Sequence, residues 1–300
     1  MQAEFSFDRI QSVEFCVNVR LERARRTSYL IPIDETVQDA LKQVLQDTVE
    51  VVTPEDGRWS AYELSEKYGS TETLRASLSE ASMASILALY VDEGWSINAG
   101  ALSDPKKINY YFAVFRDKHA RKLVAVRQAT QFKGAFKGRF LSVFDNTLRM
   151  IPDKVFKLDD KFDFLITKQH VYILHPLAFD RIAEIEEYAS ARAHHLTLAL
   201  GTAVKFMDFT ELADFVAGHK RAARLVSALT SRNDLRSIKR ALFIKAAHET
   251  GVKLKRTGTK IVPDKGSELG CLEMLDDRRY TTALRSGAKP AFVASGRRRI

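Results

Sequence analysis

The sequence lacks several features that assign a protein to a class at sight. Only two of its 300 residues are cysteines, Cys16 and Cys271, which lie far apart and outside any CxxC pair. A disulfide framework and a cysteine-ligated zinc site are therefore excluded, and we expect a reducing compartment, the cytoplasm. No apolar run approaches the roughly 18 residues that span a bilayer. The acidic and polar start, MQAEFSFDRI, predicts no signal peptide.

Motifs that identify common enzyme classes are also missing. The chain has no GxSxG, no Walker loop, no GxGxxG and no HExxH. The segment GAFKG at 134–138 is a glycine–lysine loop without the Lys-Ser/Thr pair that nucleotide binding requires. His194 and His195 are adjacent, so their side chains diverge on a helix and do not form a metal site. We therefore expect no cofactor and no metal.

Charge is abundant and unevenly distributed along the chain, whose net charge is +9. Residues 34–93 hold 13 acidic and 4 basic residues, whereas 116–139 hold 8 basic and 1 acidic, and 220–260 hold 12 basic and 2 acidic. The last 25 residues add a net +5. An acidic first third followed by basic stretches indicates a polyanionic partner for the basic part. The alternative is a set of solvated faces without a partner.

Hydrophobic patterning predicts an α+β protein with two domains. Residues 1–100 are expected to form a small acidic α/β domain that contacts a partner or a second subunit, with a helix capped by Asp34. Residues 105–300 are expected to form the second domain. Within this domain, residues 108–175 are predicted to form an antiparallel sheet, in which INYYFAVFRD and RKLVAVRQAT form a hairpin. Its part 176–300 turns helical and basic.

The C-terminal part contains a pattern that resembles a winged helix. Asp234 is expected to cap one continuous helix through LRSIKRALFIKAAHETG, with Leu235, Ile238 and Leu242 on its inner face and Gly251 as its stop. The following VKLKRTGTKIVP alternates around TGT and predicts a hairpin. Helix, turn, helix and hairpin follow one another as in winged-helix proteins.

Nine cations on three segments are the candidate phosphate ligands. They are Lys133, Lys137, Arg139, Arg236, Lys239, Arg240, Lys253, Lys255 and Arg256. The middle three stand at spacing i, i+3 and i+4 and are expected to share one helix face, while Lys253 and Lys255 share one face of the next strand. The first three lie among Phe132, Phe136 and Phe140, which we interpret as core residues. No base-reading pattern is present, so we expect salt-sensitive binding to the DNA backbone.

One acidic stretch raises the alternative of a nuclease. The segment 155–174, VFKLDDKFDFLITKQHVYIL, and the residue shortly before it contribute four carboxylates, which are Asp153, Asp159, Asp160 and Asp163. Asp153, Asp160 and Lys161 approximate the Pro-Asp…Asp/Glu-x-Lys pattern of Mg²⁺-dependent nucleases. The gap is short for carboxylates from neighbouring strands, and Asp also caps turns. We interpret these acids as turn and outer-face positions, with Asp163 on a wet face, and keep the nuclease as the alternative.

Four motifs of this chain resemble the DUF4868 family of the Kiwa anti-phage defence system, over roughly residues 105–300. They are VFKLDDKFDFLI, HVYILHPLAFDRIAEI, DDRRYTTALRSG and FVASGRRRI. The resemblance implies a cytoplasmic effector that binds double-stranded DNA and blocks phage DNA replication and expression. It also implies self-association as a dimer or tetramer and docking onto KwaA, a membrane protein, and it transfers no catalytic signature. A scaffold whose basic faces meet anionic lipid headgroups is a third possibility.

Overall fold

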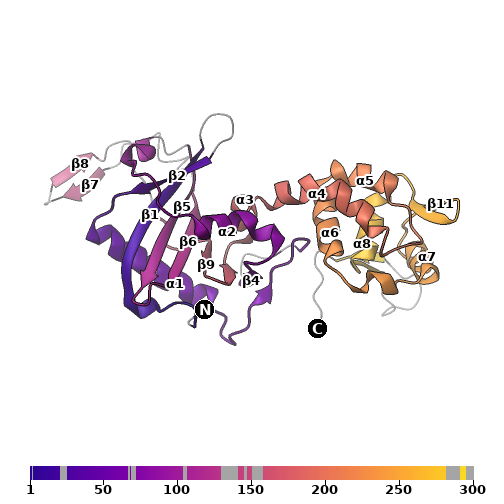
Figure 1. Ribbon diagram of the computed structural model, residues 1–300, viewed down its shortest axis with the longest axis horizontal. Helices are drawn as coiled ribbons and strands as arrows, with labels where there is room; N and C mark the ends of the chain where they lie inside the picture. Colours follow the sequence, from indigo (N-terminus) through magenta and orange to yellow (C-terminus); the bar gives the residue numbers. More distant parts are fainter. Residues whose placement is uncertain are drawn as a thin grey trace. The chain divides into compact units, whose positions relative to one another are not determined.

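The chain folds into two compact units (Figure 1). In the computed structural model the described residues are 1, 3–20, 26–66, 68, 72–103, 107–129, 141–144, 147–150, 158–281 and 291–294. Unit 1 comprises Met1–Ala61 and Ser70–Ala183, and unit 2 comprises Tyr62–Gly69 and Glu184–Ile300. The fold class is α+β, as predicted, since helices accompany a largely antiparallel sheet. Within the described ranges, no helix is both long and apolar enough to cross a membrane.

An eight-stranded sheet forms the centre of unit 1, in the strand order β2-β1-β5-β6-β9-β10-β4-β3. Its strands are β1 (Ile10–Arg20), β2 (Arg26–Ile31), β3 (Ser60–Ala61), β4 (Leu74–Ser77), β5 (Ile108–Asp117), β6 (Lys122–Gln128), β9 (Phe164–Ile166) and β10 (His170–Ile173). The other elements are η1 (Phe7–Arg9), α1 (Glu35–Val52), η3 (Ala81–Met83), α2 (Ala84–Val91), η4 (Ala99–Ser103), the hairpin β7 (Leu141–Phe144) and β8 (Thr147–Met150), and α3 (Pro176–Ile182). Neighbouring strands are antiparallel except β3 and β4. The pairing of β5 with β6 confirms the predicted hairpin.

Helices cover both faces of this sheet. On one face, Leu41 of α1 is fully buried in the same apolar cluster as Leu165 of β9. On the other face, Phe164 meets Phe179 of α3 edge-on, with 5.2 Å between the ring centroids. The side chain of Asp34 accepts a hydrogen bond from the backbone N–H of Val37 at 2.9 Å, which confirms it as the cap of α1. Because both faces are covered, β9 is buried along its whole length and β5, β6 and β10 are mostly buried.

The expected division between residues 1–100 and 105–300 is not where the structure divides the chain. β1, from the first segment, pairs along its length with β5, from the second, and both strands contribute to one apolar cluster. The division falls instead between Ala183 and Glu184, and residues 62–69 belong to unit 2. The change from acidic to basic composition reflects exposed side chains, and it carries no information on which strands share a sheet.

Unit 2 is a mainly helical assembly around its own apolar core. Its elements are α4 (Ile185–Leu200), α5 (Thr210–Ala217), α6 (Lys220–Thr230), η7 (Asp234–Ser237), α7 (Arg240–Glu249), β11 (Leu254–Thr257), β12 (Lys260–Pro263), α8 (Glu268–Leu275), β13 (Arg279–Thr281) and β14 (Ala291–Val293). Leu212, Val226 and Leu275 lie in one buried cluster. Gly251, with φ +71°, follows α7, and β11 pairs with β12. The predicted helix stop and hairpin are therefore confirmed.

The single helix predicted after Asp234 is two elements, η7 and α7, separated by an extended Lys239. Asp234 does not cap a helix because its carboxylate accepts the Nε and Nη2 hydrogen bonds of Arg232, both at 2.8 Å. The Ser237 hydroxyl also turns back to the Asp234 carbonyl at 2.6 Å. Such side-chain bonds to nearby backbone compete with continued helix.

The break changes which side chains face the core. Leu235 is 2% exposed and Ile238 packs against the core, as predicted. Leu242, however, is 62% exposed, so its predicted inner position is wrong. Phe243 takes the inward position on α7, with 4% exposure, because α7 begins at Arg240 and its face toward the core is set by that new start.

Candidate nucleic-acid interface

The start of α7 and the turn of the β11–β12 hairpin lie together in unit 2. Arg240 donates from Nη1 to the carbonyl oxygen of Thr259 at 3.0 Å. The turn has two residues between the paired Thr257 and Lys260, and Gly258 adopts the positive φ of +60° that such turns need. Two groups of cations that are separate in the sequence are therefore neighbours in space. We call residues 236–240 together with 253–260 the α7–hairpin region.

The N-terminus of α7 adds positive potential to this region. Lys239 occupies the cap position, no side chain caps the helix, and the first turn contains no acidic residue. A helix N-terminus carries roughly half a positive charge and presents free backbone N–H groups. Phosphate groups bind readily at such ends. The helix end and the neighbouring cations therefore favour an anion at the same place.

The six described candidates differ in how freely they can contact phosphate. Lys255 is paired with Glu211 of α5, with 3.2 Å between Nζ and Oε2. In the hairpin register Lys255 lies opposite Val262 and Arg256 lies opposite Ile261, so these two cations point to opposite sides. Among the residues that the structure describes, the candidates without an acidic partner are Arg236, Lys239, Arg240, Lys253 and Arg256, and Arg240 contacts a backbone carbonyl.

The expected shared helix face of Arg236, Lys239 and Arg240 does not form. Arg236 belongs to η7, Lys239 is extended, and Arg240 opens α7. All three nevertheless lie within five residues, at the end of η7 and the start of α7. These cations are therefore brought together by the contact of Arg240 with Thr259 in the hairpin turn, and not by helical spacing.

Two exposed lysines, Lys260 inside this region and Lys245 beyond residue 240, were not among the sequence candidates. Lys260 closes the hairpin opposite Thr257, and Lys245 lies on α7; both side chains are exposed. The TGT turn was the signal for Lys260, because a two-residue turn places its flanking residues next to one another. Lys245 had no such signal, since its position depends on where α7 begins.

The other basic candidates, Lys133, Lys137 and Arg139, lie outside the described residues, and so does Asp153 of the nuclease pattern. Phe132, Phe136 and Phe140 lie there as well and are not assigned to the core or the surface.

The acidic stretch is organised around a partly buried arginine. Arg127, at the end of β6, contacts Asp159 from Nε at 3.2 Å and Asp163 from Nη1 at 2.7 Å. The backbone N–H of Gln128 donates to the second oxygen of Asp163 at 2.6 Å. The backbone N–H of Asp159 donates to the Tyr111 hydroxyl at 3.0 Å, and burial raises the pKa of that tyrosine. Both carboxylates are thereby held inside unit 1 as an ion-pair cluster.

The predicted wet-face position of Asp163 is wrong. Its exposure is 2% and that of Asp159 is 5%. His175 reinforces the arrangement, because its Nδ1 lies 2.9 Å from Asp163 Oδ1 and its backbone N–H donates to the Asp163 carbonyl at 3.0 Å. Alternation with Phe162 and Phe164 indicated an outer face, but the sheet is covered on both sides. The carboxylate of Asp163 is therefore stabilised by its ion pair with Arg127 and not by hydration.

Asp160 and Lys161 differ from their acidic neighbours. Asp160 is exposed and Lys161 is half-buried. Within the described residues, no group of three His, Cys, Asp or Glu side chains is arranged to hold a metal ion. Asp159 and Asp163, the carboxylates nearest in sequence, face the Arg127 guanidinium.

Residues 106–285, more than half of the chain, match the model of a family described as Kiwa protein KwaB-like. No curated protein and no solved structure matches the chain. The matched range contains the Arg127 cluster of unit 1 and the entire α7–hairpin region of unit 2.

Proposed function

The chain belongs to the Kiwa protein KwaB-like family, and from this premise we propose that it acts in anti-phage defence as an effector that binds double-stranded DNA. Binding occurs largely through phosphate contacts and blocks phage DNA replication and expression. The α7–hairpin region is the described part of the contact surface. The observation that carries the proposal is the group of cations without acidic partners around the uncapped start of α7.

The distribution of charge between the units supports a polyanion. Unit 2 contains 23 Lys and Arg against 15 Asp and Glu, whereas unit 1 contains 24 against 23. Almost the whole net charge of +9 therefore belongs to unit 2. A positive unit of this kind attracts nucleic acid over a distance of about one Debye length, ~8–10 Å at physiological salt.

Phosphate contacts make a quantitative prediction. Each neutralised phosphate lowers the slope of log K against log salt by about 0.9 on duplex DNA. Lys239→Ala is expected to remove one phosphate contact, which lowers the magnitude of that slope by about 0.9. Binding is expected to weaken similarly on all duplex sequences. Lys42→Ala removes a half-buried cation, which pairs with Asp39, from α1 of unit 1 and is the matched control, for which we expect an unchanged slope.

The first experiment mixes the purified chain with labelled linear duplex DNA across a salt series, with and without Mg²⁺. Fluorescence anisotropy reports binding, and a denaturing gel reports strand integrity. Salt-dependent binding to intact DNA is the expected result. Absence of binding at low salt would overturn the proposal.

Cleavage is the other informative outcome of the same experiment. Cutting that requires Mg²⁺, stops with a chelator and is lost in Asp160→Ala would favour a nuclease that uses Asp153, Asp160 and Lys161. Binding to anionic vesicles at a salt concentration that abolishes duplex binding would favour the scaffold. Glu187→Ala, at an exposed carboxylate of α4, is the control for the Asp160 substitution.

A KwaA-like membrane protein is the proposed partner, at the inner face of the membrane, and a dimer or tetramer is the proposed assembly. The exposed acidic side of α1, with Glu35 and Glu50, supports the partner contact, since cytoplasmic loops of membrane proteins are rich in Lys and Arg. Deleting residues 1–100 would remove β1 from the sheet, so charge reversal is the better test. Co-purification with the partner is expected to fail for Glu35→Lys/Glu50→Lys and to persist for Glu187→Lys; undiminished capture of the double variant would refute the contact.

A further inference from the structure

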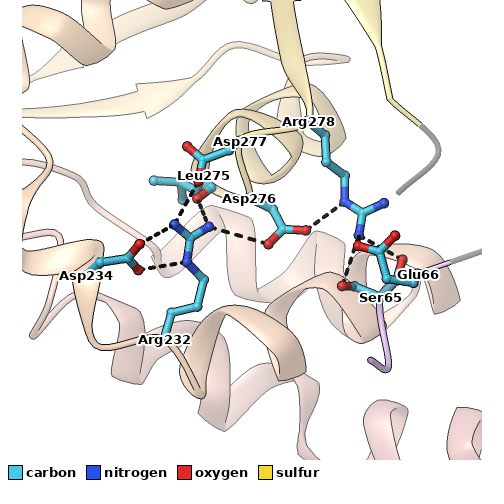
Figure 2. Close-up of polar contacts among 8 residues, drawn as sticks. All are labelled: Ser65, Glu66, Arg232, Asp234, Leu275, Asp276, Asp277 and Arg278. Atoms are coloured by element: carbon cyan, nitrogen blue, oxygen red, sulfur yellow. Dashed lines mark hydrogen bonds and ion pairs between the residues drawn. The ribbon is translucent and has the colours of Figure 1, made fainter. Parts of the chain in front are cut away.

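A chain of ion pairs in unit 2 runs from the buried Arg278 to the half-exposed Asp234 (Figure 2). It starts at Arg278, which is 1% exposed. Arg278 donates from Nε to Asp276 at 2.6 Å, and from Nη2 to the carbonyl of Ser65 at 3.0 Å, its hydroxyl at 2.9 Å and Glu66 at 3.0 Å. The guanidinium therefore ties the segment Tyr62–Glu66 to the residues that follow α8. Arg224 adds a second anchor to this segment, since its Nε donates to a backbone carbonyl within it at 2.6 Å.

Asp276 extends the connection to a second arginine. Its Oδ1 lies 3.5 Å from Nη1 of Arg232, whose side chain is 10% exposed. Arg232 binds both carboxylate oxygens of Asp234 at 2.8 Å and also contacts Asp277 at 2.8 Å. Paired hydrogen bonds between a guanidinium and a carboxylate fix orientation as well as distance. Arg232 therefore fixes the position of Asp234, as Figure 2 shows.

Asp234 is also the first residue of η7, the turn that presents Arg236. The Ser237 hydroxyl closes this turn by donating to the Asp234 carbonyl. Lys239 and Arg240 follow directly. The chain of ion pairs thus ends at Asp234, directly before the cations that we propose as phosphate ligands.

We propose that this chain of ion pairs is a positioning relay, and that the segment Tyr62–Glu66 sets DNA affinity through it. The relay consists of Glu66, Arg278, Asp276, Arg232 and Asp234. It holds residues 236–240 in the conformation that binds phosphate, and none of its members contacts DNA. The inference rests on the proposed function and adds to it a means of control located away from the binding surface.

The physical reason lies in the cost of breaking a buried pair. When one partner of a buried ion pair is removed, the charge that remains is uncompensated and its surroundings rearrange. Loss of Glu66 removes one of the carboxylates that Arg278 binds, so the guanidinium draws Asp276 away from Arg232. Arg232 then holds Asp234 less firmly. Ligands that are no longer preorganised bind more weakly, because ordering them opposes binding.

The relay makes a prediction opposite to that of simple electrostatics. Glu66→Ala removes a negative charge, which by charge alone strengthens binding to DNA. We expect binding about 5- to 10-fold weaker instead, within the usual range of coupling between sites. The salt slope is expected to stay unchanged, because the number of phosphate contacts is the same. Glu66→Gln keeps a hydrogen-bond acceptor and is expected to recover part of the affinity.

Glu63→Ala is the matched control, since it removes the same charge from the same segment. Its backbone N–H and carbonyl contact Tyr68, and Ala preserves both. Duplex affinity is measured by anisotropy across a salt series, and hydrogen exchange is measured for the amides of residues 234–240. Faster exchange there is expected in Glu66→Ala and not in Glu63→Ala. If Glu66→Ala does not fold, Ser65→Ala, which removes a single hydroxyl contact, takes its place.

The two readouts separate the relay from the proposed function. Wild-type protein that does not bind DNA overturns the proposed function, and hydrogen exchange still tests the coupling within unit 2. Glu66→Ala that matches Glu63→Ala in both affinity and exchange overturns the relay. Weaker binding with a reduced salt slope overturns it as well, because Glu66 would then be acting through the number of phosphate contacts.

Discussion

Arg240 and Thr259, nineteen positions apart in the chain, are joined by a hydrogen bond of 3.0 Å from the guanidinium Nη1 to the backbone carbonyl. This bond holds the start of α7 to the turn of the β11–β12 hairpin. The remaining N–H groups of the guanidinium are available to a phosphate, so one side chain both organises the surface and contributes to it. A lysine at this position has a single ammonium and cannot do both with the same geometry.

Arg240→Lys is therefore expected to weaken duplex binding several-fold while leaving the salt slope unchanged, because the charge remains and the fork is lost. Lys239→Arg is the control that keeps both charge and reach at the neighbouring position. Anisotropy over a salt series gives both quantities. Equal affinity of Arg240→Lys and the wild type would show that the hairpin contact does not contribute.

Glu211 restrains a candidate ligand by pairing with Lys255. Glu211→Gln frees the Lys255 ammonium and removes a negative charge, so we expect tighter DNA binding. We also expect a steeper salt dependence, because up to about one more phosphate contact can form. Asp214→Asn removes the same charge from an 81% exposed carboxylate on the same helix. A gain that is equal in both variants would assign the effect to net charge, and Lys255 would no longer be a phosphate ligand.

Arg127 compensates two buried carboxylates, Asp159 and Asp163. Arg127→Leu leaves both without their cation, and we expect a loss of about 3–5 kcal/mol in the free energy of unfolding. Asp160→Asn, at an exposed position, is expected to change stability by less than about 0.5 kcal/mol. Urea unfolding followed by circular dichroism measures both. A small effect of Arg127→Leu would contradict the interpretation of this cluster as a buried ion-pair network.

Asp117 makes stability depend on pH at the acidic end. Burial raises the pKa of this carboxyl, but hydrogen bonds from the backbone N–H groups of Arg121, His119 and Ser6 and from the Arg121 side chain outweigh it and lower the pKa to about 2. The unfolded value is about 3.9. The folded pKa is thus depressed, so its contribution is complete above pH ~4 and is lost as the pH falls toward ~2.

Asp117→Asn is expected to be less stable than the wild type at pH 7 and to show a shallower decline of stability between pH ~4 and ~2. Thermal unfolding at a series of pH values gives this slope. An identical slope in the variant would mean that other carboxyls account for the acid dependence.

Features that depend on a few neighbouring residues could be predicted from the sequence. The Asp34 cap, the β5–β6 hairpin, the β11–β12 hairpin and the Gly251 stop each follow from the preferences of residues close together in the chain. The α+β class followed from the order of these elements. The continuous helix after Asp234 was wrong because Arg232, two residues earlier, takes the carboxylate that would have capped it.

The candidate site was predictable as a set of cations and not as a surface. Basic composition identified Arg236, Lys239, Arg240, Lys253, Lys255 and Arg256, but not that Lys255 pairs with Glu211 or that Arg240 reaches Thr259. Lys245 was missed because its position depends on where α7 begins, whereas the TGT turn was a signal for Lys260. Pairing between segments tens of residues apart determines which cations are neutralised, and spacing along the chain does not contain it.

The sequence by itself determined the local elements, the charge of each segment and, through its motifs, the family. Tertiary structure decided the rest: that β1 joins β5 in one sheet, that Asp163 is buried beside Arg127, and that Arg278 reaches back 213 positions to Ser65. The physical reason is that local preferences act within one or two turns of chain. Burial and ion pairing depend on which distant segments come together, and the long-range packing of the whole chain selects them.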